Sequence, residues 1–240
     1  MTAFDRTKVK EVLSETIVST FYIRNKEPNI FKNTLDCFGA VLDAKVLSMS
    51  LDDWVSKVEI PRTTQKSLQN NVGIIHQKVL GTVDGWRDME TGEVVDLVSM
   101  DRQVIVEIKN KHNTTKGNHK IVIWDDLHEL ITNEYEGFTG YYVEILPKSK
   151  KTYDKEFTPS NNKGPNPPAN PLIRQIDGRS FYALVTGEED ALDQFYEMFS
   201  EIVDEVLKEN FEDYKSVDLG VRQSEFFNEI LKLISLISKF

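Results

Sequence analysis

Three charged residues interrupt two apolar, β-prone runs in the segment Val94–Lys111. Asp96 lies on the first run, whereas Glu107 and Lys109 lie on the second. The short polar stretch Met100–Arg102 separates the runs, which is typical of a β-hairpin. Two carboxylates and a lysine gathered on one hairpin face are residue types that can hold a divalent cation and assist attack on a phosphodiester.

The register of this hairpin decides whether the three side chains meet. If Asp101 and Arg102 form the turn, the residue numbers of every opposed pair across the hairpin add up to the same total. Asp96 then lies directly opposite Glu107, with Cβ atoms roughly 5 Å apart. Lys109 shares the face of Glu107 because side chains alternate along a strand. A turn shifted by one residue would move Asp96 off that face, and Asp-Arg is not a strong turn pair.

Two facing carboxylates repel each other, which costs stability. Mg²⁺, which prefers one or two carboxylate oxygens together with waters and phosphate, would remove this cost. The competing interpretation is a solvated strand face with a cross-strand salt bridge. The neighbouring positions are apolar, as in a strand buried on both faces, namely Val94, Val95, Leu97, Val98, Val104, Ile105 and Val106. Because buried charges are costly unless they pair or bind metal, we favour the metal site.

The chain of 240 residues carries a formal net charge of −10, but this charge is unevenly distributed. Gly187–Tyr214 contains eleven acidic residues and only Lys208 as a base, so this segment alone nets −10. By contrast, Ile108–Trp124 and Phe157–Ile176 contain no acidic residue and carry several basic ones. Local basic surfaces matter more than total charge for phosphate contact, although ordinary solvated loops would show the same pattern.

Length and cysteine content indicate the class of protein. The single cysteine, Cys37, excludes an internal disulfide and is typical of a reducing compartment. The N-terminus lacks an apolar signal-peptide region, and no apolar run approaches the roughly 20 residues that span a bilayer. We therefore expect a cytoplasmic protein with one domain over residues 1–240: a helical N-terminal region 1–60, a catalytic core at about 63–147 and a C-terminal region 148–240.

Hydrophobic periodicity and turn residues predict the elements that position these side chains. Helices are predicted at Lys8–Tyr22, Phe31–Leu47, from a cap at Thr63 or Thr64 to Leu80, Ile123–Tyr135, Glu189–Lys208 and Ser224–Phe240. Strands are predicted at Thr82–Trp86, Glu93–Ser99, Gln103–Lys109, Gly140–Leu146 and Phe181–Thr186, with a Pro-rich loop at Lys148–Pro171. The order from Thr63 to Leu146 is therefore helix, three strands, helix, strand, which indicates an α/β fold.

Two short motifs, Val95-Asp96 and Glu107-Ile108-Lys109, resemble the catalytic motif of the PD-(D/E)XK nuclease superfamily. Valine stands here in place of the proline that usually precedes the aspartate. More specifically, QKSLQNNVGIIHQKVLG (Gln65–Gly81), Gly85-Trp86 and EIKNKHNT (Glu107–Thr114) resemble type II restriction endonucleases that cut GGNCC-like sites. The resemblance implies a restriction-endonuclease-like core, with a mixed central sheet flanked by helices.

The resemblance also implies roles for the site residues. Asp96, Glu107 and the Ile108 carbonyl would hold Mg²⁺, while Lys109 would orient or deprotonate the attacking water. Members of the superfamily often add a polar residue from the preceding helix. The candidates for this catalytic support are Glu59, Gln69, His76 and Gln77, of which we prefer His76 and Gln77. The alternative for a helix histidine is a hydrogen-bonded packing residue.

Contacts to DNA are expected from the acid-free segments, because Arg and Lys pair with guanine or phosphate and Asn and Gln with adenine. The candidates for DNA binding are Lys111, His112, Asn113, Lys116, Lys163, Arg174 and Gln175. A zinc site built from His112 and His119 is disfavoured, since the chain has one cysteine and no nearby partner residues.

A nearly palindromic site cut on both strands implies a homodimer with one active site per strand. The C-terminal helix could supply the interface or pack on the core, and the acidic segment would face away from DNA. We expect an Mg²⁺-dependent type II restriction endonuclease that hydrolyses double-stranded DNA and leaves 5′-phosphates. Alternatives are a structure-selective repair or junction nuclease of the same fold, and a catalytically inactive DNA-binding protein.

Overall fold

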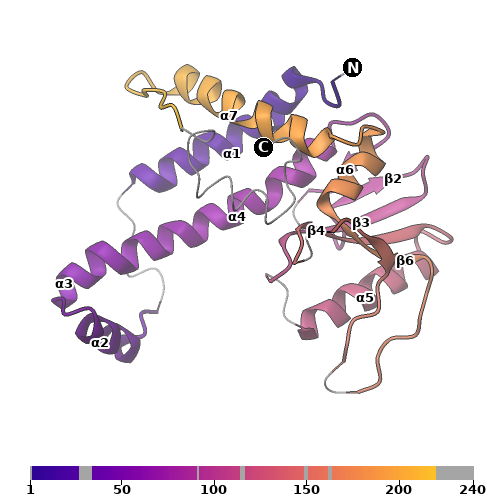
Figure 1. Ribbon diagram of the computed structural model, residues 1–240, viewed down its shortest axis with the longest axis horizontal. Coiled ribbons are helices and arrows are strands. Elements are labelled where there is room, and N and C mark those ends of the chain that lie inside the picture. The colour runs from indigo at the N-terminus through magenta and orange to yellow at the C-terminus, as the bar shows by residue number, and fades with distance from the viewer. Residues whose placement is uncertain are drawn as a thin grey trace.

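A six-stranded sheet with the order β1-β2-β3-β4-β6-β5 forms the centre of the molecule (Figure 1). The computed structural model describes residues 2–26, 34–90, 92–113, 117–148, 151–161 and 164–219. The strands are β1 (Arg87–Asp88), β2 (Leu97–Ser99), β3 (Val104–Lys111), β4 (Thr139–Leu146), β5 (Asp154–Glu156) and β6 (Ile173–Asp177). The predicted mixed α/β sheet is confirmed.

Strand directions divide the sheet into an antiparallel and a parallel part. β2 runs antiparallel to both β1 and β3, whereas β3, β4 and β6 run parallel to one another, and β5 runs antiparallel to β6 at the far edge. Because parallel strands need a crossover connection, helix α5 (Gly117–Thr132) joins β3 to β4. The predicted order of helix, three strands, helix and strand is therefore confirmed.

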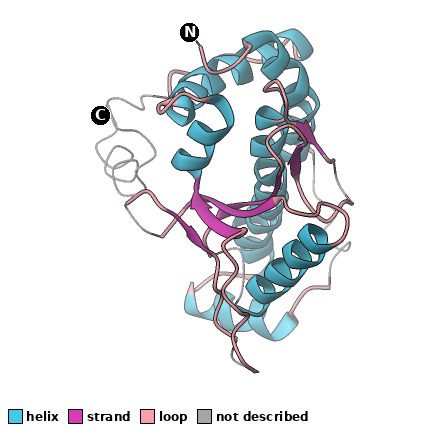
Figure 2. Cartoon of the chain, turned by 90° about the vertical axis from the view of Figure 1, so that its right-hand side faces the viewer, coloured by secondary structure: helices cyan, strands magenta, loops and turns pink. Residues whose placement is uncertain are grey.

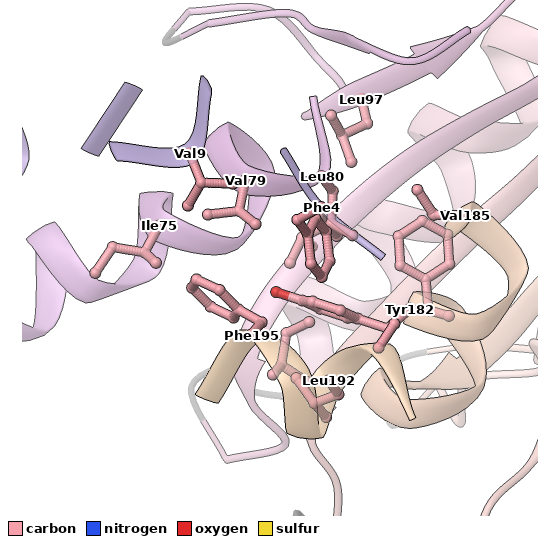
Figure 3. Packing of buried hydrophobic residues seen from close by; sticks show 14 of the residues in the cluster. Phe4, Val9, Ile75, Val79, Leu80, Leu97, Tyr182, Val185, Leu192 and Phe195 are labelled. Atoms are coloured by element: carbon pink, nitrogen blue, oxygen red, sulfur yellow. The ribbon is translucent and has the colours of Figure 1, made fainter. Parts of the chain in front are cut away.

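Helices cover both faces of the sheet (Figure 2). On one face, Ile105 and Tyr142 of the sheet pack with Trp124 and Leu127 of α5. On the other face the sheet packs against α4 (Ile60–Leu80) and α6 (Gly178–Thr186), and α1 (Arg6–Asn25) and α7 (Ala191–Asn210) pack on these two helices in the same hydrophobic cluster. Figure 3 shows side chains of these helices converging, among them Val9, Val79, Tyr182 and Phe195. This layer fixes α4 beside the hairpin.

The helix before the hairpin begins earlier than predicted. Ser50 caps α3 (Leu51–Trp54) by accepting a hydrogen bond from the Asp53 N–H, and the π-helical turn η2 (Val55–Glu59) leads directly into α4. The expected cap at Thr63 or Thr64 is wrong, because both hydroxyls instead donate to carbonyls of the preceding turn. Helix α2 (Cys37–Val46), by contrast, begins later than the predicted Phe31, with Asp36 as its N-cap. The result is a long arm of α2, α3 and α4 extending from the sheet (Figure 1).

The largest error of the sequence prediction lies in the C-terminal region. Phe181–Thr186, predicted as a strand, belongs to helix α6, and the strand β6 lies just before it. Asp177 caps α6 by accepting from the Ser180 N–H, and Gly187 ends it with a φ of 80°. A Cβ at Gly178 would lie 2.5 Å from the Ile145 carbonyl oxygen, so β4 and the start of α6 approach too closely for a side chain.

Other boundaries shift without changing the topology. Residues 82–86, expected to be extended, form turns, α5 begins at Gly117 rather than near Ile123, and β5 interrupts the predicted loop Lys148–Pro171. Helix α7 matches the prediction at Glu189–Lys208 closely. The helix predicted at Ser224–Phe240 lies outside the described residues. Among the helices that the structure describes, none is long and apolar enough to cross a membrane.

Candidate active site

The hairpin formed by β2 and β3 has the predicted register. Leu97 pairs with Val106 and Ser99 with Val104. The residue numbers of both pairs add up to the total expected from a turn centred on Asp101 and Arg102. The Gln103 N–H donates to the Met100 carbonyl at 3.2 Å and closes that turn. Gln103 adopts a φ of 53°, a left-handed conformation that lets the chain enter β3.

Asp96 departs slightly from the predicted pairing. Regular pairing ends at Leu97, and the Asp96 N–H donates to the Val106 carbonyl at 2.8 Å. The Asp96 carboxylate turns toward β3 and accepts a hydrogen bond from the Ile108 N–H at 2.6 Å. The carboxylate is thus fixed beside Glu107 by the backbone of β3, not by a place in the ladder opposite it.

The two carboxyl groups of the hairpin interact strongly. Burial and the nearby negative charge of Asp96 raise the pKa of Glu107 to about 7. The pKa of Asp96 is also raised, first by burial, although the Ile108 N–H and Lys109 oppose the rise. Each raised pKa means that the folded protein disfavours the charged form, because burial and repulsion between the carboxylates outweigh the nearby donors.

Lys109 supplies the positive charge nearest to this pair. Its ammonium group forms a salt bridge with Glu107, as their shared face of β3 predicts. The side chain of Lys109 is 33 % exposed and that of Glu107 is 16 % exposed, so the pair lies at the mouth of the site rather than in the core. Both groups can therefore be reached by a substrate.

A cleft of about 330 Å³ opens at this point between α4 and the ends of β2 and β3. Its lining includes Asp96, Lys109 and Lys111 from the sheet side and Gln69 and Gln77 from α4. Two of the predicted catalytic residues, Asp96 and Lys109, therefore line one cleft with the predicted DNA-binding Lys111 and the preferred helix residue Gln77. Within the described ranges, no group of three or more His, Cys, Asp or Glu side chains gathers closely enough to hold a metal ion by itself.

Gln77 has a partner that the sequence did not indicate. Its side-chain amide donates to the Asp88 carboxylate at 3.0 Å, and Asp88 in turn raises the pKa of Asp96. Asp88 reaches the site because β1 pairs with β2, placing Asp88 opposite Leu97. A two-residue strand carries no pattern that would mark it in the sequence.

His76 lies behind the cleft, in the packed layer of helices. Its ring forms a hydrogen bond with the Tyr182 hydroxyl at 2.7 Å and contacts the Phe195 ring edge-on. Burial lowers the pKa of His76 to about 4, while a hydrogen bond with the Asn110 side chain opposes this. The geometry supports the packing interpretation of His76, whereas Gln77, the other preferred candidate, lines the cleft. Glu59, another candidate, pairs with Arg62 far along the helix.

The predicted DNA-binding residues fall into two groups. Lys111 lines the cleft, and His112 and the exposed Asn113 follow it at the end of β3. Arg174 and Gln175 lie on β6, where the Arg174 guanidinium donates to the Asp154 carboxylate at 2.6 Å. Lys116 and Lys163 lie outside the described residues.

A further acidic residue, Glu144 on β4, is buried beside the site. Lys120 of α5 donates to one carboxylate oxygen at 2.6 Å, the Tyr142 hydroxyl donates to the same oxygen at 3.1 Å, and the Tyr153 hydroxyl donates to the other at 2.8 Å. Burial alone would raise the pKa of Glu144, but these donors, with Lys120 and Tyr153 foremost, outweigh burial and lower it.

Comparison with known proteins identifies the family of this chain. The sequence model of the Eco47II restriction endonuclease family matches residues 4–208, which include every cleft residue named above. The type II restriction enzyme Eco47II of Escherichia coli is 40% identical over 187 residues, covering 76% of this chain and 77% of that protein. The type II restriction enzyme Sau96I of Staphylococcus aureus is 32% identical over 168 residues, covering 68% and 64% respectively. The chain belongs to the Eco47II restriction endonuclease family and is a type II restriction endonuclease, an enzyme that acts on DNA.

Proposed function

We propose that the cleft between α4 and the β2–β3 hairpin is the active site, and that Asp96, Glu107 and Lys109 hydrolyse double-stranded DNA with Mg²⁺. The observation that carries this proposal is the pair of crowded carboxylates with raised pKa values beside a reachable lysine. A bound divalent cation would favour the charged forms of both carboxylates. Mg²⁺ fits because it needs only one or two carboxylates, the rest of its shell being water and phosphate oxygens.

Each residue of the hairpin has a distinct task in this proposal. Asp96 and Glu107, with the Ile108 carbonyl, would hold the ion, and the Ile108 N–H keeps the Asp96 carboxylate pointed at the site. When bound, the metal would polarise the scissile phosphate and lower the pKa of a water. Lys109 exchanges its bond to Glu107 for one to the water or the phosphate, where it offsets developing negative charge. Gln77, held by Asp88, lies on the opposite wall and can orient the substrate.

The finer features of the function extend the same proposal. Cleavage leaves 5′-phosphates, and the recognition site is GGNCC-like, as the resemblance of Gln65–Gly81 and Glu107–Thr114 implies. Lys111, His112 and Asn113 continue from the catalytic strand and contact the DNA next to the cut. A nearly palindromic site requires two active sites related by a twofold axis, so the working enzyme is a homodimer.

Incubation of plasmid DNA with the full chain and Mg²⁺ tests the proposal. We expect discrete fragments whose sequenced ends report one recognition site, and no cleavage in the presence of a chelator. Glu107→Ala and Lys109→Ala should abolish cleavage, whereas Glu11→Ala, at an exposed position on α1, should not. Retained cleavage by either hairpin variant would refute this site.

Two further results distinguish the alternatives. Cleavage confined to branched or mismatched substrates would favour a structure-selective nuclease, and binding without any cleavage would favour an inactive DNA-binding protein. The homodimer is tested by the mass in solution, which should be twice the chain mass of 27.6 kDa. A monomer that stays monomeric on its DNA site would contradict the twofold arrangement.

A further inference from the structure

The most completely bonded polar group beside the proposed active site is the carboxylate of Glu144. It accepts hydrogen bonds from Lys120, Tyr142 and Tyr153, which come from α5, β4 and the segment before β5. The Lys120 ammonium also lies 5.2 Å from the centre of the Tyr142 ring, within cation–π range. Glu144, Tyr142 and Tyr153 thus hold the Lys120 ammonium group in one position.

Strand register places this cluster next to the catalytic hairpin. Lys109 is the partner of Glu144 across β3 and β4, and Glu107 is the partner of Tyr142. Because side chains alternate along strands and paired residues share a face, all four point to the same side of the sheet. The Lys120 ammonium, bonded to Glu144, therefore lies one strand away from the proposed catalytic lysine. Figure 1 shows α5 beside this part of the sheet.

Lys120 keeps bonding capacity that the cluster does not use. An ammonium group has three N–H donors, and the bond to Glu144 takes one of them. The Lys120 side chain is 25 % exposed, whereas that of Glu144 is 5 % exposed, so the open side of the pair is the lysine. The segment around it, Ile108–Trp124, contains no acidic residue that would repel an anion.

A purely structural role explains this arrangement poorly. A buried ion pair often contributes no more stability than apolar residues of similar volume would, because both charges lose hydration. Here two tyrosine hydroxyls are also committed to orienting one carboxylate. Such an arrangement fixes the ammonium group in position before a ligand arrives, which is what an anion site at a reaction centre requires.

We propose that Lys120 binds a phosphate of the cleaved DNA strand beside the scissile phosphodiester, with Glu144, Tyr142 and Tyr153 as its positioning residues. The inference rests on the proposed function, because it takes Glu107 and Lys109 as the cleavage site. Lys109 then serves the reacting phosphate and Lys120 its neighbour, so the strand is held on both sides of the bond that breaks.

Salt dependence of DNA binding tests the contact without any need for cleavage. In the full chain carrying Glu107→Ala, affinity for a short duplex is measured over a range of salt concentrations in chelator. Lys120→Met should weaken binding and reduce the slope of log K against log salt by about 1, the loss of one phosphate contact. Lys120→Arg, which keeps the charge, should restore most of the slope.

Lys10 of α1 provides a matched control. It is also 25 % exposed and forms a salt bridge of 2.6 Å, with Glu209, but lies on the acidic α1–α7 side of the molecule. Lys10→Met should leave the slope unchanged. Equal slopes for Lys120→Met and the parent protein, at unchanged thermal stability, would overturn the proposal. Equal losses for Lys10→Met and Lys120→Met would also overturn it, because the effect would then be one of net charge.

A neutral methylphosphonate scanned along one strand gives the second readout. A methylphosphonate at one position should weaken binding by the parent protein but have no further effect on binding by Lys120→Met, since the same contact is already lost there. If the methylphosphonate at every position weakens binding by the two proteins equally, Lys120 contacts no phosphate. Failure here is separable from failure of the proposed function, which would appear as cleavage by the Glu107→Ala protein.

Discussion

Glu107 and Glu144 lie on neighbouring strands, face the same side of the sheet and are each bonded to a lysine, yet their pKa values shift in opposite directions. The pKa of Glu107 rises to about 7, with burial as the largest cause and repulsion from Asp96 next. The pKa of Glu144 falls, because three donors outweigh the burial that by itself would raise it.

The difference lies in how many donors each carboxylate has and which charges surround it. Glu144 has its hydrogen-bonding needs met within the protein, so it can serve as a fixed part of the structure. Glu107 has one lysine and two nearby acids, Asp96 and Asp126, so it remains short of positive charge. A site that lacks positive charge in the free protein is one that gains most from a cation and a substrate.

The largest expected effect separates the two glutamates by activity. Glu107→Gln keeps the size of the side chain but removes the charge that would hold the metal, so cleavage should fall by roughly a thousandfold or more, on the order of 4 kcal/mol in the barrier. Initial rates on a plasmid with one site measure this. A variant within tenfold of the parent would remove Glu107 from the reaction.

The free energy of unfolding should depend more on Glu144 than on Glu107. Glu144→Gln leaves Lys120 without its counter-ion, so the free energy of unfolding should fall by about 2–3 kcal/mol, less than for a fully buried pair because Lys120 is partly exposed. Glu107→Gln relieves repulsion with Asp96 and should change stability by no more than about 1 kcal/mol in the metal-free protein. Denaturant unfolding of both variants checks the contrast, and similar losses would contradict it.

His76, in the layer behind the cleft, should give the protein a pH-dependent stability that neither glutamate explains. Its pKa of about 4 in the folded state lies below the ordinary value of 6.5, so the unfolded chain binds more protons between these values. Stability is then full above pH 6.5 and is lost as the pH falls toward 4, by about 3 kcal/mol.

The carboxylates titrate in the same range, so the comparison must be made with a variant. His76→Gln should show a smaller decline in unfolding free energy between pH 6.5 and 4 than the parent protein. Parallel curves for the two proteins would mean that His76 is not held neutral by burial.

The smallest effect should come from a single donor of the Glu144 cluster. Tyr153→Phe removes one hydrogen bond to the carboxylate and no charge, so stability should fall by about 1–2 kcal/mol. Unfolding of the double variant Tyr153→Phe with Glu144→Gln gives the coupling. If the two losses simply add, Tyr153 does not act through Glu144.

Much of the β2–β3 hairpin was predictable because its determinants are local. The turn at Asp101-Arg102 and the apolar runs on both sides indicated the register, and strand alternation placed Glu107 and Lys109 on one face. The position of Asp96 was predicted less exactly, since its bond to the Ile108 N–H breaks the ladder. Hydrophobic periodicity does not predict which backbone group a side chain will bond to.

The error at Phe181–Thr186 has a similar cause. Its apolar, β-prone residues favour a strand, but the Asp177 cap and the Gly187 terminus define a helix that packs Phe181 and Tyr182 into the core. The cap and the glycine were visible in the sequence, and the apolar run obscured them. Strand propensity was overridden by tertiary packing.

The hairpin, its charged residues and the order of elements around it could be predicted from local sequence, because turns and side-chain periodicity act over a few residues. The bond between Gln77 and Asp88 and the turn of His76 into the core depend instead on tertiary packing. Tertiary packing also brought Lys120 to Glu144 through the crossover that α5 makes between two parallel strands. Contacts between residues far apart in the chain depend on how whole layers pack, and no local sequence pattern predicts such contacts.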